Sequence, residues 1–71
     1  MTFGEMLTFT KRLKNILEVN APQAVKDARL ANLMSDLEIA YNIPMLRNKE
    51  FEQQNPFVMQ MYWTISELRD L

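Results

Sequence analysis

Apolar residues recur at three- and four-residue steps along three long segments, the spacing that gathers them on one face of an α-helix. The first segment begins with Thr2 and Glu5 in the spacing of a capping box, in which each side chain bonds a free backbone N–H. Its apolar stripe consists of Met6, Phe9, Leu13, Ile16 and Leu17. We expect a helix over residues 3–19, ended by Asn20 in a left-handed cap and by Pro22.

The second segment has the most pronounced apolar pattern in the chain. Pro22 is suited to the first helical position, where the N–H that proline lacks would be unpaired anyway. A broad apolar face comprises Leu30, Leu33, Met34, Leu37, Ala40 and Tyr41, and a narrow row of small residues beside it comprises Ala24, Ala28 and Ala31. A helix over 22–41, ending at Asn42 before Ile43-Pro44, can therefore pack against two neighbours.

The periodicity fades between residues 43 and 55. Asn48 is placed to cap a short helical turn near 49–53. The remaining apolar residues of this connection are Ile43, Met45, Leu46 and Phe51. They are too apolar for a solvated loop, and we expect them to fold over the open end of the bundle.

The last segment starts with a capping residue, Asn55, followed by proline at the first helical position, Pro56. Its main apolar face comprises Phe57, Val58, Met61, Tyr62, Ile65, Leu68 and Leu71. The tripeptide Asn55-Pro56-Phe57 also resembles the short ligands of EH-type endocytic adaptor domains. A helix N-terminus with its phenylalanine packed inward explains the same three residues, and we expect a helix over 56–70.

These segments predict an all-α fold, a three-helix bundle with a short helical turn between the second and third helices. Its 71 residues make one small domain, 1–71. A core of this size supplies roughly 3–5 kcal/mol, so small domains are usually reinforced by disulfides, a metal or another chain. The sequence contains neither cysteine nor histidine. Of these three reinforcements only association with another chain remains, and we therefore expect a protein partner or a homo-oligomer.

Met59 and Trp63 widen the apolar arc of the last helix beyond what one neighbour needs. In one interpretation, Trp63 covers the end of the core with its N–H at the surface. In the other, Met59, Tyr62 and Trp63 form a partner interface, because tryptophan, tyrosine and methionine are enriched where proteins meet.

Charge is unevenly distributed along a chain whose net charge is only −1. Residues 1–35 carry five basic and three acidic side chains, and the rest carries three basic and six acidic ones. The cluster of Lys11, Arg12 and Lys14 favours either a solvated helix face or, as an alternative function, weak binding of nucleic acid.

Catalysis is not expected, since the chain has no histidine or cysteine and a single glycine. Asp36 with Glu38 and Glu50 with Glu52 are close acidic pairs, but residues two apart on a helix point away from each other. We therefore expect no enzyme activity, no cofactor, no metal and no small-molecule substrate. The chain also lacks the long apolar run of a membrane span or secretory signal, which indicates a cytoplasmic protein without membrane contact.

The favoured function is a non-catalytic protein-interaction module or a small bacterial or phage regulatory protein. Its general likeness is to small helical proteins of bacteria and their phages, and this likeness assigns no residue a role.

Overall fold

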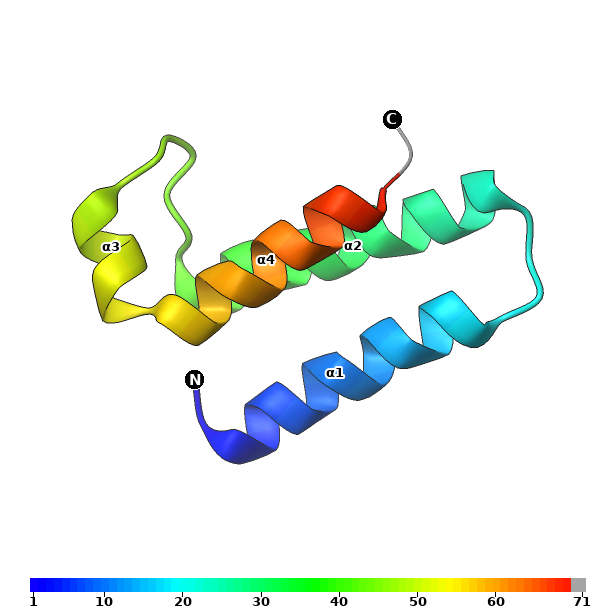
Figure 1. The fold of residues 1–71 in the computed structure, drawn as a ribbon, viewed down its shortest axis with the longest axis horizontal. Coiled ribbons are helices and arrows are strands. Elements are labelled where there is room, and N and C mark those ends of the chain that lie inside the picture. Colours follow the sequence, from blue (N-terminus) through cyan, green and yellow to red (C-terminus); the bar gives the residue numbers. More distant parts are fainter. Residues whose placement is uncertain (70–71) are drawn as a thin grey trace.

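The computed structural model describes residues 1–69 and contains four helices in that range, without a β-strand (Figure 1). They are α1 (Phe3–Glu18), α2 (Gln23–Tyr41), α3 (Lys49–Gln54) and α4 (Pro56–Leu68). The all-α helical bundle is thus confirmed, and α3 is the short turn predicted near 49–53. Residues 70 and 71, including Leu71 of the predicted apolar face, lie outside the described residues.

The start of α1 is fixed by the predicted capping box. The backbone N–H of Thr2 donates to Glu5 Oε1 over 2.9 Å, and the N–H of Glu5 donates to Thr2 Oγ1 over 3.1 Å. The other carboxylate oxygen of Glu5 accepts a bond from the Tyr41 hydroxyl at the far end of α2. The pKa of Glu5 is lowered mainly by the hydrogen bond from the Thr2 backbone. Hydrogen bonds with the Thr2 side chain and the Tyr41 hydroxyl lower it further.

The helix ends differ in part from the sequence prediction. Asn42 ends α2 in the left-handed region with φ 53° and ψ 48°, and its N–H donates to the Glu38 carbonyl. The predicted left-handed backbone conformation of Asn20 is wrong, because Asn42 is the one non-glycine residue with positive φ within 1–69. After α1 the chain instead continues in extended backbone at Val19. Pro22 precedes the first helical residue of α2 rather than occupying it.

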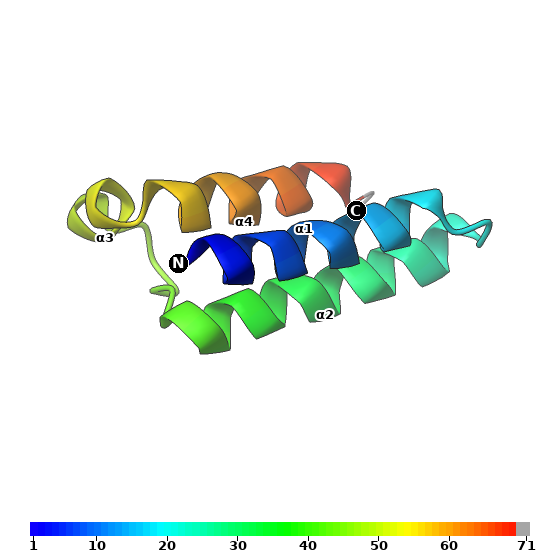
Figure 2. The ribbon, with the colours of Figure 1, turned by 90° about the horizontal axis from the view of Figure 1, so that it is seen from below.

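Helix α2 is the centre of the bundle. Both α1 and α4 pack against it, whereas α1 and α4 make few direct contacts with each other. In Figure 1 α1 and α4 run in the same direction and α2 runs against them. Figure 2 shows α1 and α4 on the same side of α2, with α3 beyond one end of the bundle.

The core lies along the predicted apolar face of α2. Its buried cluster comprises Leu30, Leu33, Met34, Leu37 and Ile65. Phe9, Leu13 and Ile16 of α1 are half-buried against this cluster. Of the small-residue row, Ala24 and Ala28 are exposed and Ala31 is half-buried, so the row does not form a second packed face as expected, and Ala40 of the broad apolar face is exposed as well. Helix α1 itself has no fully buried residue, and Leu17 of its predicted stripe is exposed.

Helix α4 is rotated relative to the prediction. It buries Val58, Met59 and Ile65, while Phe57 is 66% exposed. The prediction that Phe57 packs inward is therefore wrong. The helix turns Val58 toward α2 and leaves Phe57 on the flank. Pro56 occupies the first turn as expected. Asn55 does not cap the helix with its side chain, which instead donates to the Phe51 carbonyl over 3.1 Å.

The connection between α2 and α3 only partly follows the expectation. Asn48 Oδ1 accepts the N–H of Phe51 over 3.0 Å, which confirms the predicted cap of α3. Ile43 and Phe51 are half-buried. Met45 is fully exposed and Leu46 is 83% exposed, so these two residues do not cover the core.

The central role of α2 predicts that Leu37→Ala destabilises the protein far more than a change on its surface. Leu37 is completely buried, and such a truncation costs about 2–5 kcal/mol, comparable with the whole stability of a domain this small. Urea unfolding followed by circular dichroism should show a largely unfolded variant in water. Ile39→Ala, at an exposed α2 position, is the matched control and should shift the free energy of unfolding by at most about 0.5 kcal/mol.

Candidate functional site

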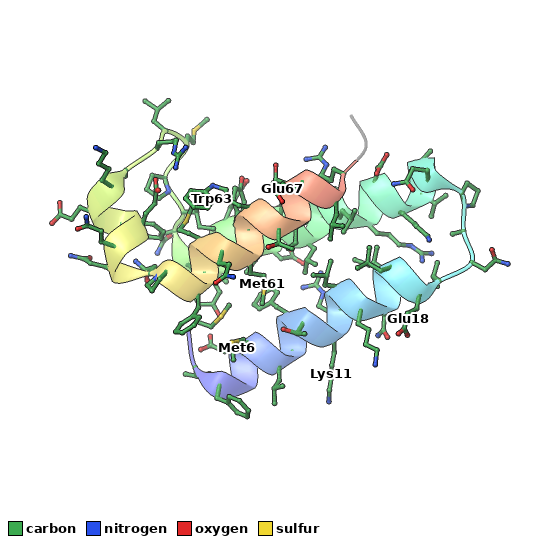
Figure 3. All side chains as sticks on the ribbon, in the orientation of Figure 1. Met6, Lys11, Glu18, Met61, Trp63 and Glu67 are labelled. Atoms are coloured by element: carbon green, nitrogen blue, oxygen red, sulfur yellow. The ribbon has the colours of Figure 1, made fainter. Side chains whose placement is uncertain are left out.

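Trp63 lies on the flank of α4 that faces α3, and its side chain is 38% exposed. The guanidinium of Arg47 lies over the indole ring, 4.8 Å from the ring centroid. The same Arg47 pairs with Glu52 on α3 over 3.2 Å. In Figure 3 Trp63 lies on the side of α4 away from α1. The indole is thus held by the connection before α3 while one part of it meets solvent.

Two hollows meet at Trp63. One is an open groove of roughly 500 Å³ between α3 and α4, with Met59 and Trp63 in its wall and Lys49, Glu52 and Glu67 among its charged residues. The other lies under the connection and is lined by Ile43, Pro44, Met45, Leu46, Arg47, Phe51, Tyr62 and Trp63, among others. We call the exposed part of this region, Met45, Leu46, Arg47 and Trp63, the Trp63 surface.

The three residues predicted to form an interface lie together but differ in exposure. Trp63 is accessible, Tyr62 is half-buried and Met59 is only 7% exposed. Met59 and Trp63 line both hollows, and Tyr62 lines the one under the connection. Met59 and Tyr62 therefore support the indole from below, and Trp63 is the residue of the three that a partner can reach over a large area.

Sequence reasoning missed Met45, Leu46 and Arg47 as parts of this region. Their apolar character predicts that Met45 and Leu46 fold over the open end of the bundle, because apolar side chains usually leave water. A signal was present in the sequence, since two large apolar residues precede an arginine in a connection without helical periodicity. Only the folded connection brings Arg47 onto Trp63, 16 positions further along the chain.

Tyr62 is fixed by a bond to α2. Its hydroxyl donates to Glu38 Oε1, and this bond, together with burial and the nearby carboxylate charge, raises the pKa of Tyr62 to about 12. The bond joins α4 to α2 directly beneath the Trp63 surface. The phenol is neutral at physiological pH, as an ordinary tyrosine is, so Tyr62 acts as a hydrogen-bond donor rather than as a base.

The basic cluster of α1 does not converge on one site. Arg12 pairs with Asp36 of α2 over 2.6 Å and lies over the Phe9 ring at 5.6 Å. Lys14 approaches Glu18 to 3.9 Å. Lys11 points away from the bundle (Figure 3). Since the side chain of Arg12 is engaged with α2, the structure adds no support to the nucleic-acid alternative, which stays a prediction.

Residues 1–69 contain neither a cluster of metal ligands nor a helix suited to span a membrane. No group of three or more acidic residues in this range is arranged to hold a metal ion. None of the four helices combines the length and the apolar character needed to cross a bilayer. Comparison with protein-family models, with curated proteins and with solved structures found no match to this chain.

The Tyr62–Glu38 bond predicts a pH dependence at the alkaline end. Because the pKa of Tyr62 is raised in the folded state, its stabilisation is complete below pH 10 and is lost as pH rises toward 12. Tyrosinate absorbance should show one tyrosine ionising near pH 12, and Tyr62→Phe should remove that step. The free energy of unfolding of Tyr62→Phe should fall less steeply over this range. A Tyr62 that ionises near pH 10 in the folded protein would contradict the bond.

Proposed function

We propose that this chain is a non-catalytic protein-interaction module, a small bacterial or phage regulatory protein of the cytoplasm that recognises a protein partner through the Trp63 surface. The observation that carries the proposal is the half-exposed indole under Arg47, next to Met45 and Leu46, whose side chains stand in solvent. Tryptophan, arginine and methionine are the residue types enriched at protein interfaces.

The exposure of these apolar side chains to water supports the proposal that a partner covers them. Single exposed apolar residues are ordinary, but contiguous groups of large ones commonly mark a binding site. Met45 and Leu46 come from the connection, and Trp63 from α4, yet all three line the same hollow. A partner that buries them removes apolar area from water without any change in the helical bundle.

The support beneath the indole also favours recognition. Met59 is buried one helical turn before Trp63 and lines the same hollow, and the Tyr62–Glu38 bond fixes the helix turn that carries the indole. An anchor that is already held in place loses little conformational entropy when it binds. The charged residues of the neighbouring groove, Lys49, Glu52 and Glu67, provide the polar rim that usually surrounds such an anchor.

The proposal predicts that Trp63→Ala loses a partner that the unaltered protein retains. The tagged protein is incubated with an extract of its source organism, and bound proteins are quantified by mass spectrometry. Removing the indole from a central anchor typically weakens binding by about 2 kcal/mol or more, roughly thirtyfold. Arg47→Ala should weaken binding of the same partner to a smaller extent, because it removes the guanidinium that lies over one face of the Trp63 ring.

Ile39→Ala is the matched control, since Ile39 is a large, 78% exposed residue on α2. It should retain the partner, and circular dichroism must show that all three variants are folded. The proposal is wrong if no protein binds more strongly to the unaltered chain than to Trp63→Ala. It is also wrong if Ile39→Ala loses the same protein to the same extent.

A further inference from the structure

A second apolar surface lies on the other flank of α4, where α1 and α4 pack on α2 without closing on each other. The two helices form the walls of an open groove lined by Met6, Thr10, Leu13, Phe57, Gln60, Met61 and Thr64. Figure 3 shows Met6 and Met61 on the facing sides of α1 and α4. We call this hollow the α1–α4 groove.

The residues along each wall repeat with the spacing of a helix–helix seam. On α1 the row is Phe3, Met6, Thr10, Leu13 and Leu17, and on α4 it is Phe57, Met61, Thr64 and Leu68. Steps that alternate between three and four residues are those of coiled-coil core positions. Leu13 and Met61 are half-buried against the core, but Phe3 is 71% exposed and Phe57 is 66% exposed, so the outer positions of both seams are open to solvent.

We propose that the α1–α4 groove is covered by the same groove of a second copy of this chain, with α1 of each copy lying on α4 of the other. This inference does not rest on the Trp63 surface, which lies on the opposite flank of α4, although Glu67 of the groove beside Trp63 is used in both proposals. Four helices would then enclose one apolar seam about a two-fold axis parallel to them. The two seams that each chain leaves open would become a shared core.

Charge selects this arrangement over its alternative. Lys11 and Glu67 point away from the groove on opposite flanks (Figure 3), and Lys14, three residues after Lys11, shares its flank. A two-fold axis across the helices would place α1 on α1 and bring Lys11 and Lys14 of both copies together. An axis along the helices places these lysines beside Glu67 of the second copy, which favours the pairing of α1 with α4.

The heights of these residues agree with that pairing. Leu13 and Thr64 are the last residues of α1 and α4 that line the groove. Lys14 and Glu67 follow them by one and three residues on helices that run in the same direction, so both lie toward the same end of the groove. Lys14 is also available for a new partner, because its present approach to Glu18 is long, at 3.9 Å, and exposed. Each dimer would contain this pair twice.

The size of the groove sets the expected strength of the dimer. Helices of 16 and 13 residues present a face roughly 20 Å long and 20 Å wide. This projected area of about 400 Å² is about half of the ~800 Å² that each partner buries in a standard stable interface. We therefore expect a dimer that is weaker than one with a standard stable interface. It would also supply the reinforcement that a chain without cysteine and histidine lacks.

The first test is sedimentation equilibrium from micromolar to millimolar concentration. The unaltered protein should change from monomer to dimer, and Phe57→Lys should raise the dissociation constant at least about tenfold by placing a charge in the seam. Trp63→Lys, at a 38% exposed aromatic residue on the other flank of α4, is the control and should dimerise normally. Circular dichroism must show both variants folded.

The second test reads the arrangement with introduced thiols, since the chain has no cysteine of its own. A mixture of Lys14→Cys and Glu67→Cys should form a mixed disulfide dimer under mild oxidation. Lys11→Cys alone should form little, because the two copies of this residue lie on opposite sides of the proposed dimer. Ile39→Cys, at an exposed position of α2, gives the background of disulfides that form by random collision.

Two results would overturn self-association through the α1–α4 groove, and a third would overturn the pairing of α1 with α4. One is a protein that stays monomeric up to millimolar concentration. The other is a dimer that Trp63→Lys abolishes and Phe57→Lys does not, which would move self-association to the Trp63 surface. Efficient disulfide formation by Lys11→Cys alone would overturn the pairing of α1 with α4. Each of these outcomes is separate from the partner test of the Trp63 surface, because that test compares Trp63→Ala with Ile39→Ala in an extract.

Discussion

Burial of the leucine face of α2 is the interaction on which the rest of this structure depends. Leu30, Leu33 and Leu37 are almost completely removed from water, and Ile65 of α4 packs into the same cluster. Both other long helices rest on α2, and they contribute little to each other. The bundle is therefore organised around one central helix rather than around three equivalent pairs, and the loss of the α2 face would release α1 and α4 together.

This arrangement divides the surface of α4 into two flanks with different neighbours. On one flank the connection and α3 approach, and Arg47 lies over Trp63. On the other flank α1 runs alongside at the same side of α2, with Met6 and Met61 between the helices. One short helix thereby supplies residues to the core and to both proposed binding surfaces, which explains why its apolar arc is wider than a single neighbour requires.

Two polar contacts hold the helices together near the end of α2. The Tyr41 hydroxyl donates to Glu5, which itself belongs to the capping box of α1. Nearby, the Tyr62 hydroxyl donates to Glu38 and joins α4 to α2. In both cases a neutral phenol donates to a carboxylate, so these contacts specify which helix turns meet without burying an unpaired charge. Such fixed turns are what a rigid interaction surface needs.

The sequence alone determined the helices, several of their ends and the buried face of α2. Local chemistry decides these features: Thr2 with Glu5, Asn48 and Asn42 act on neighbouring backbone groups, and helical spacing places the α2 leucines on one side. It also indicated Trp63 as a residue at the edge of the α4 face, where the structure places it half in solvent.

Only the tertiary structure decided which side of each flanking helix is covered. Periodicity fixes the angles between residues on one helix, but the rotation of that helix against its neighbours depends on packing across the bundle. Phe57 is therefore exposed and Met59 buried, contrary to the order that spacing predicted. The connection has no period at all, so the exposure of Met45 and Leu46 and the stacking of Arg47 on Trp63 follow from contacts between distant parts of the chain.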